Sequence, residues 1–431
     1  MREMRDIPQA SSTLFVTSPP RADLSLSMIE FIPLAALLTC LTALSIDIML
    51  PVLPELGRDL GLTRANDQQW VVTTYLAGLV IGQLFVGSIS DRFGRLPILY
   101  CGLALFIFGA AMASLATSFH WLLAARAVQG MGAAAPRIIT VAVVRDLYAG
   151  RQMARIMSLV MTTFIMVPVF APSIGQLLAI VGDWRTPIMF LAGAGMIAMV
   201  WAWIRLPETS PRHARGTEKT AQAAPSISYF QALRAVYRSR QTVGYIMANG
   251  CMFACLMSYI LSSQQIFVDI YALGAWFPVA FGAIAIAIAL SGAVNALVVV
   301  RYGMRHVSHR ALLAFIVVAG CVAALGFLYG GQPPFWALWV GLWVQFLFFG
   351  LIVSNFNALA IEPLGHVAGT ASSVMGSYTT LSGAVFGTSV GQLFDMTTLP
   401  MNVGFVVFSS ISLIIVLITE RGRLFHSDST A

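Results

Sequence analysis

The sequence predicts an all-α membrane protein whose twelve transmembrane helices form two pseudo-symmetric halves of six helices each. Hydrophobic residues make up 58% of the chain and charged residues only 10%, whereas a soluble domain carries about 25% charged residues. Twelve apolar runs are long enough to cross a bilayer, which requires about 20 helical residues. One long polar segment separates these runs into two groups of six.

The apolar runs give the expected helices in chain order. In the first half they cover 29–53, 70–90, 96–116, 120–143, 153–180 and 186–206. In the second half they cover 242–264, 274–300, 311–330, 335–360, 368–393 and 402–419. Pro51 and Pro54 mark where the first helix bends or ends. The expected units are an N-terminal tail (1–28), a first half (29–206), a linker (207–240), a second half (241–419) and a C-terminal tail (420–431).

The basic residues predict the orientation in the membrane. An even number of spans places both chain ends on one side, and 20 of the 25 Lys and Arg residues lie in the tails and loops of that side. Three lie in the opposite loops and two inside the fourth helix. By the positive-inside rule both termini are cytoplasmic, and we expect a multi-pass protein of a bacterial-type inner membrane. The linker is polar, and we expect it to end in a short interfacial helix over 229–240.

The two halves resemble each other. The segment DRFGR (91–95) follows the second helix and VRYGM (300–304) follows the eighth, although the latter lacks the acidic residue and the final arginine. APSIGQLL (171–178) in the fifth helix matches GTSVGQLF (387–394) in the eleventh. A parallel repeat of six helices is typical of transporters whose site lies between the halves.

Several other functions find no support in the sequence. There is no phosphate-binding loop, no metal-ligand spacing and no nucleophile motif, so we expect neither an enzyme nor a cofactor. The net charge of +7 comes from short loops between apolar runs, so we expect no nucleic-acid partner. Without a nucleotide site, energy must come from an ion gradient or from the substrate's own gradient.

Two motifs resemble those of the major facilitator superfamily. GSISDRFGRLPIL (87–99) is similar to the family's loop between helices two and three, and RAVQGMGAA (126–134) is similar to its motif in helix four. The resemblance implies the major facilitator fold. It also implies that a loop built from Gly87, Asp91, Arg92, Gly94 and Arg95 gates the cytoplasmic side. Asp91 would pair with charges or a helix N-terminus of the other half when the outside is open. The alternative is that this loop is only a topological anchor.

A narrower resemblance is to drug:proton antiporters, in particular bacterial bicyclomycin- and chloramphenicol-resistance exporters. SIDIMLPVLPEL (45–56), VRDLY (144–148) and VPVFAPSIGQLL (167–178) carry it. The antiporter motif of helix five would comprise Pro168, Ala171, Pro172 and Gly175. Two of its usual glycines are missing, so the resemblance leaves open how closely this helix packs.

Asp47 is the only charged residue between Phe31 and Leu53. At helical spacing it shares a small, polar face with Thr39, Cys40 and Ala43, whereas Leu34, Leu37, Leu41, Leu44 and Ile48 form an opposite face that we expect to contact lipid. Burial favours the protonated form of a carboxyl group and a nearby cation favours the charged form, so such an acid can carry a proton. The alternative is a hydrogen bond to a neighbouring helix or a position among the lipid headgroups.

Arg126 and Arg137 lie on one face of helix four, together with Gln129, and we expect Gln129 to line the substrate cavity. Arg126 is expected at the depth of Asp47, and we predict that it adjusts Asp47 or the polar network around it, although it could instead only cap backbone carbonyls. We consider two positions equally for the Arg137 side chain, one lining the cavity and one extending to the cytoplasm.

Weaker candidates for substrate contact come from the second half, and each could instead form a hydrogen bond between helices. They are Gln264, Gln265, Asn355, Asn357 and Tyr378. Glu362 is expected to balance cytoplasmic arginines rather than to carry protons.

These features favour a secondary transporter that exports small apolar or amphiphilic compounds by proton antiport and alternating access. The expected partners are a small-molecule substrate, protons and membrane lipid, and we expect a monomer. One alternative is an importer or metabolite exporter with the same fold. Another is a receptor or scaffold that transports nothing.

Overall fold

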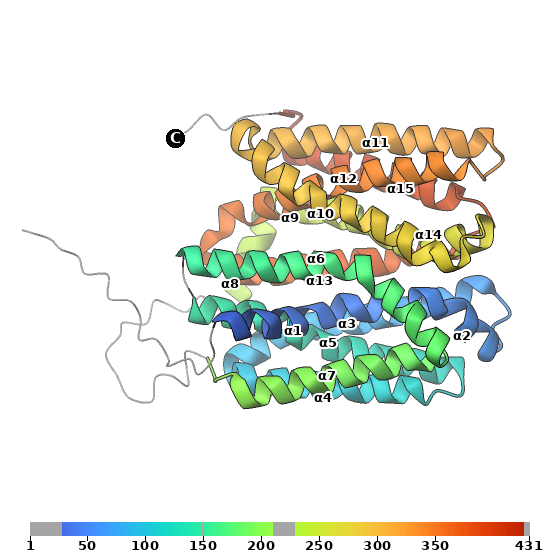
Figure 1. Ribbon diagram of the computed structural model, residues 1–431. Helices are drawn as coiled ribbons and strands as arrows, with labels where there is room; N and C mark the ends of the chain where they lie inside the picture. Colours follow the sequence, from blue (N-terminus) through green and yellow to red (C-terminus); the bar gives the residue numbers. More distant parts are fainter. Residues whose placement is uncertain (1–27, 149, 210–228, 426–431) are drawn as a thin grey trace, which may run out of the picture.

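The computed structural model describes residues 28–148, 150–209 and 229–425 (Figure 1). Within these ranges the chain is helical and forms no strands. The first half comprises α1 (Met28–Asp47), the short helices η1 (Leu50–Val52), α2 (Leu53–Asp59) and η2 (Ala65–Gln69), then α3 (Trp70–Phe93), α4 (Arg95–Ser114), α5 (Phe119–Leu147), α6 (Gly150–Val181) and α7 (Arg185–Arg205).

The second half begins after α8 (Tyr229–Arg238), a short helix within the predicted segment 229–240. It comprises α9 (Arg240–Gln264), η3 (Gln265–Ile270), η4 (Gly274–Trp276), α10 (Phe277–Tyr302), α11 (Met304–Leu328), α12 (Phe335–Ile361), η5 (Glu362–Val367), α13 (Ala368–Ser382), η6 (Gly383–Gly387), α14 (Thr388–Gln392) and α15 (Leu399–Thr419). The expected all-α fold with twelve membrane helices is confirmed, and α13, η6 and α14 together form the eleventh.

Eleven helical segments of the described chain are long and apolar enough to cross a membrane. The remaining predicted span, 368–392, is rich in serine, threonine and glycine, and π-helical turns interrupt it at Gly383–Gly387. The ninth helix begins at Met304 rather than at the predicted residue 311. Its first turns carry Arg305 and His309, whose polar partners are described below.

Figure 1 shows the two halves lying side by side, with α1–α7 in blue to green and α9–α15 in yellow to red. Helix α6 packs against α10 and α3 packs against α13, so these pairs join the halves. We call the end of the bundle where α1 begins and α15 ends the near end, and the opposite end the far end (Figure 1).

The prediction that the leucine face of the first helix contacts lipid is wrong. Leu34, Leu41 and Ile48 are completely buried, because α1 packs against α5, α6 and α7. Leu37 and Leu44 of the same predicted face are only partly buried. A central helix is covered on both faces, so the spacing of its apolar residues does not identify a side exposed to lipid. The small, polar face is also buried, with Thr39 1% and Ala43 9% exposed.

Candidate functional site

Asp47 is the last residue of α1 and lies inside the bundle, with only 3% of its surface exposed. The helix stops here because the chain turns into the 3-10 segment that contains Pro51. Within the described part of the chain, no hydrogen bond or ion pair reaches the Asp47 carboxylate. A charged carboxylate in such surroundings is costly, so the site favours a protonated acid or one paired with a group that arrives during function.

Arg126 of α5 is completely buried and is held by oxygen atoms of three helices. Its guanidinium donates to the Ser45 carbonyl at 2.7 Å, to the Val71 carbonyl at 3.3 Å and to Gln129 Oε1 at 2.6 Å. It also lies 4.6 Å from the centre of the Tyr75 ring. The Ser45 carbonyl is in the last turn of α1, where carbonyls lack helical partners and a cation is favourable. Arg126 therefore caps the helix that carries Asp47.

The structure thus places Arg126 next to the end of α1 but does not bring its side chain to Asp47. The two residues form no ion pair, and the guanidinium contacts backbone instead, as in the alternative considered from the sequence. An effect of Arg126 on Asp47 would act through the position of the α1 backbone.

The glycine in the Arg-x-x-Gln-Gly motif explains how Arg126 reaches α3. A Cβ atom on Gly130 would lie 1.9 Å from the Tyr75 carbonyl oxygen, and one on Gly78 would lie 1.9 Å from the Ala127 carbonyl oxygen. Only glycine at both positions lets α3 and α5 pack backbone to backbone. This contact brings the Val71 carbonyl within reach of Arg126.

Two further residues of α5 were predicted to line a substrate cavity. The Gln129 side chain is completely buried, and its Nε2 has no hydrogen-bond partner among the described residues. Arg137 is partly buried and lies 5.5 Å from the centre of the Phe164 ring on α6. Their contact with substrate stays a prediction.

The polar residues predicted in the second half make contacts between helices. Asn355 donates to Asn295 on α10 at 2.7 Å, and Asn357 accepts a hydrogen bond from Asn249 on α9 at 2.8 Å. The Tyr378 ring packs where a Cβ on Gly250 would lie only 2.5 Å away. Contact of these residues with a substrate stays a prediction.

Gln264 and Gln265 belong to a group that joins the two halves at the far end. Gln68 donates to Gln264 at 3.2 Å, and Gln69 donates to Gln265 at 2.6 Å. Further bonds link Asn66 with Gln265 and with the backbone at Gln392, and the Thr73 and Thr388 hydroxyls are 2.7 Å apart. We call the side chains of Asn66, Gln68, Gln69, Gln264, Gln265 and Gln392 the far-end amide cluster.

The predicted gating loop forms a charged cluster within the first half at the near end. Arg95 pairs with Asp91 at 2.5 Å and with Asp146 at 3.1 Å. The Glu208 carboxylate accepts the backbone N–H groups of Arg95 and Leu96 at the start of α4. Gly94 has the positive φ of 105° that the tight turn requires.

In this conformation the Asp91 carboxylate pairs with Arg95 of its own half. Its predicted pairing with the second half concerns the state that is open to the outside and stays a prediction. Arg92 is exposed and contacts the Phe93 ring. Gly87 lies near the second half, since a Cβ there would lie 3.9 Å from Ser373 Oγ.

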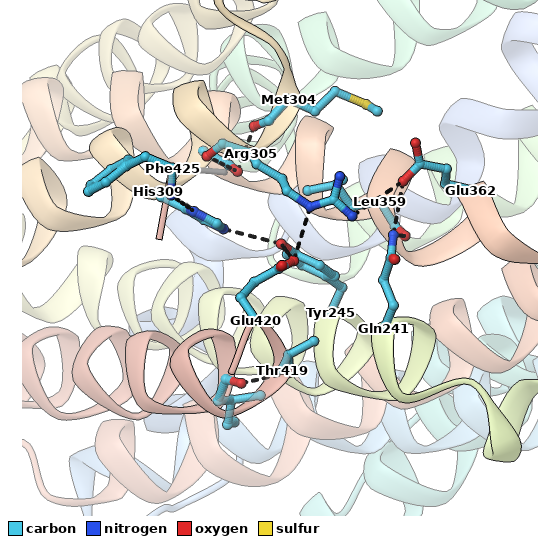
Figure 2. A network of polar contacts seen from close by, with 12 residues as sticks. Gln241, Tyr245, Met304, Arg305, His309, Leu359, Glu362, Thr419, Glu420 and Phe425 are labelled. Carbon is cyan, nitrogen blue, oxygen red and sulfur yellow. Dashed lines mark hydrogen bonds and ion pairs between the residues drawn. The ribbon is translucent and has the colours of Figure 1, made fainter. Parts of the chain in front are cut away.

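The second half has a matching cluster at the near end (Figure 2). Arg305 pairs with Glu420 at 3.1 Å and with Glu362 at 3.8 Å. Gly303, with φ +78°, lies two residues before Arg305, whereas Gly94 lies directly before Arg95. The arginine that VRYGM lacks is therefore supplied two residues after its glycine, and the expectation that Glu362 balances a near-end arginine is confirmed.

Tyr245 and His309 extend this second cluster into the helix bundle (Figure 2). The Tyr245 hydroxyl donates to Glu420 at 2.6 Å and lies 3.1 Å from His309 Nε2. The Phe425 backbone N–H donates to His309 Nδ1 at 3.4 Å. Together these contacts fix the segment after α15 against α9 and α11.

The helix-five motif packs closely against α1 although two of its usual glycines are missing. A Cβ on Gly175 would lie 2.1 Å from the Ile48 carbonyl oxygen, so this glycine alone permits the approach. Ala171 is completely buried, Pro172 is buried and Pro168 is partly buried. The motif therefore holds α6 next to the end of α1, beside Asp47.

The sequence interpretation missed several of these residues. The far-end glutamines occur as adjacent pairs at 68–69 and 264–265, a signal that could have been found, although the two pairs do not occupy equivalent positions of the repeat. Asp146 and Glu208 in the first half correspond to Glu362 and Glu420 in the second. Each acid follows or ends the fourth or sixth helix of its half, so the internal repeat contained that signal.

Comparison with known proteins identifies the family. The model of the Major Facilitator Superfamily matches residues 35–388. The bicyclomycin resistance protein homolog of Haemophilus influenzae is 28% identical over 378 residues, which cover 86% of this chain and 91% of that protein. The chloramphenicol resistance protein of Pseudomonas aeruginosa is 29% identical over 376 residues, which cover 85% and 84%.

Solved structures show the same fold. The partially occluded inward-open conformation of the xylose transporter XylE from E. coli superposes with a TM-score of 0.71 at 12% identity, covering 91% of this chain and 96% of that one. The resemblance to resistance exporters that the motifs indicated is confirmed by the similar proteins. The chain belongs to the major facilitator superfamily and is a multi-pass membrane transporter rather than an enzyme.

Proposed function

We propose that this transporter exports small apolar or amphiphilic compounds in exchange for protons. The names of the similar proteins support efflux of antibiotics such as bicyclomycin and chloramphenicol. In this proposal the near end faces the cytoplasm of a bacterial-type inner membrane, because the basic loops lie there. The two halves would alternate access to a site between them.

The observation that carries proton coupling is the state of Asp47. It is a buried carboxyl group at a helix end, and no cation of the described chain neutralises it. Ionisable residues inside a membrane protein mark ion and substrate pathways by default. Asp47 would bind a proton from the far side and release it to the near side as its surroundings change.

The neighbouring groups fit this role. Arg126 fixes the end of α1 through the Ser45 carbonyl, and Gly175 lets α6 pack against the Ile48 carbonyl. Both contacts hold the backbone on either side of Asp47, so a movement of α5 or α6 changes the environment of the carboxyl group. Two arginines in the bundle and a single acid favour neutral or weakly anionic substrates over strongly cationic ones.

The far-end amide cluster and the near-end charged clusters would act as the two gates. The far end is held by hydrogen bonds between the halves in this conformation. Asp91, which is 67% exposed, is available for a partner across the near end once that side closes.

The test is a drug-susceptibility panel that includes chloramphenicol, in a bacterial host without its own efflux pumps. We expect the wild-type protein to raise resistance to at least one compound, and Asp47→Asn to abolish the gain at equal amounts in the membrane. The control is Asp269→Asn, because Asp269 is an exposed acid near the far end. If Asp47→Asn vesicles accumulated the drug at wild-type rates under a pH gradient, Asp47 would not couple transport to protons.

Measurements on the same protein distinguish export from import. An antiporter releases protons when substrate binds to the detergent-solubilised protein, whereas a symporter takes protons up. Proton uptake on adding chloramphenicol would replace our proposal with proton-driven import. If no compound of the panel moved in vesicles or changed resistance, export of this substrate class would be ruled out. The alternative of a receptor or scaffold that transports nothing would then be favoured.

A further inference from the structure

Tyr259 of α9 has a buried hydroxyl group that the contacts described so far do not explain. The residue is 3% exposed, and its hydroxyl has no hydrogen-bond partner among the described residues. Leaving a buried hydroxyl without a partner is unfavourable. Such a group in a native protein calls for a functional or structural reason.

The ring of Tyr259 is held rigidly, so the position of the hydroxyl is defined. The ring stacks on Phe281 at 5.3 Å and lies 4.8 Å from the centre of the Phe346 ring. Phe267 packs against its edge at 6.4 Å. Three aromatic side chains of the second half therefore fix the position of the Tyr259 ring.

Asp47 lies on the other side of the boundary between the halves. Helix α9 contacts the segment Leu50–Val52, which follows directly after Asp47. Helix α6 contacts both halves at this boundary. Its Gly175 meets the Ile48 carbonyl of the first half, and its Val169 meets Gly282 of the second half, next to Phe281.

We infer that Tyr259 is the hydrogen-bond donor that the deprotonated Asp47 carboxylate uses when the two halves move together. The inference rests on the proposed function. Among the described residues of the present conformation, Asp47 has no donor and Tyr259 no acceptor, and the two groups are complementary. A bond that forms only in one state of the cycle makes the charge on Asp47 depend on the relative position of the halves. Tyr259 is a positioning residue in this scheme, since it acts through Asp47.

The test is the Tyr259→Phe variant, which removes the hydroxyl and keeps the ring. We follow chloramphenicol transport in vesicles and chloramphenicol-induced proton release in detergent as functions of pH. A donor stabilises the charged carboxylate, so without it we expect the midpoint of proton release to move upward by roughly one pH unit. The thermal unfolding midpoint should stay at or above the wild-type value, because the hydroxyl has no partner to lose in this conformation.

The matched control is Tyr271→Phe. Tyr271 lies shortly after the end of α9, and its hydroxyl donates to the Pro333 carbonyl within the second half. We expect this variant to keep the wild-type pH midpoint. In the Asp47→Asn background, adding Tyr259→Phe should change nothing further.

The outcomes distinguish this inference from the proposed function. An unchanged pH midpoint in Tyr259→Phe, with Asp47→Asn inactive, overturns the role of Tyr259 and leaves proton antiport standing. An equal shift in Tyr271→Phe also overturns it. If Asp47→Asn keeps wild-type pH-driven transport, both fail. If Tyr259→Phe does not fold, the hydroxyl is structural in the present state and the inference is wrong.

Discussion

A buried arginine that binds carbonyls rather than a carboxylate is the central feature at the residue scale. Arg126 uses its planar fork to join the ends of α1 and α3, and Gln129 holds its third donor. Lysine has a single ammonium group and cannot reach three separated acceptors in this geometry. The position therefore requires arginine for structural reasons that are independent of any charge on Asp47.

We expect Arg126→Lys to lower the thermal unfolding midpoint and to abolish resistance. Each lost hydrogen bond to a charged donor costs about 1.5–3 kcal/mol, and the Ser45 and Val71 carbonyls would lose their bonds to the guanidinium. Arg137→Lys is the comparison, because Arg137 mainly contacts the Phe164 ring and a lysine ammonium retains that attraction. Equal stability losses in the two variants would contradict this account of Arg126.

At the scale of elements, the contact between α1 and α6 decides where Asp47 lies. The backbones meet at Gly175 and Ile48. Gly175 is the one glycine that the antiporter-like motif retains, since its two other usual glycines are missing. Close approach of two helices in a membrane requires small residues at the crossing. The residual motif is therefore sufficient for packing, which the sequence alone left open.

We expect Gly175→Ala to separate α6 from α1, because its Cβ would lie 2.1 Å from the Ile48 carbonyl oxygen. The variant should unfold at a lower temperature and lose transport. Gly193→Ala in α7 is the control, since a Cβ there has no neighbour within 4 Å and alanine favours the helix by about 1 kcal/mol. A Gly175→Ala protein as stable as Gly193→Ala would show that the close approach is not needed.

At the scale of the whole molecule, the sequence predicted what the bilayer dictates. The thickness of the hydrocarbon core sets the helix length, so twelve spans could be found from apolar runs. The burial of Asp47 also followed from the residue pattern, and the proximity of Arg126 to the first helix followed from matching depth together with the family resemblance. The lipid face of that helix did not, because Leu34 and Leu41 pack against protein.

The contacts between the halves could not be predicted for a different reason. Gln68 and Gln264 are 196 residues apart, and Asn66 and Gln392 are 326 apart. Amide side chains carry no charge, and no sequence motif identifies their partners. Their pairing depends on how two preformed six-helix units dock, which local patterns do not encode.

The far-end contacts lead to a prediction about the whole transporter. The Thr73 and Thr388 hydroxyls are 2.7 Å apart across the boundary between the halves. The next residue, Thr74, bonds only to carbonyls of its own helix, at 2.8 and 3.5 Å. We expect Thr73→Val to favour the state that is open at the far end, whereas Thr74→Val should leave the distribution unchanged.

The size of this effect follows from one hydrogen bond. A net contribution of about 1 kcal/mol corresponds to about a fivefold change in the ratio of closed to open molecules. Spin labels on Arg64→Cys and Gln332→Cys, one exposed far-end site in each half, report that ratio as a distance distribution after the exposed Cys101 and Cys321 are replaced. Adding Thr388→Val to Thr73→Val should have little further effect, because the bond is already lost. Identical distributions for the Thr73 and Thr74 variants would show that this bond does not hold the far end closed.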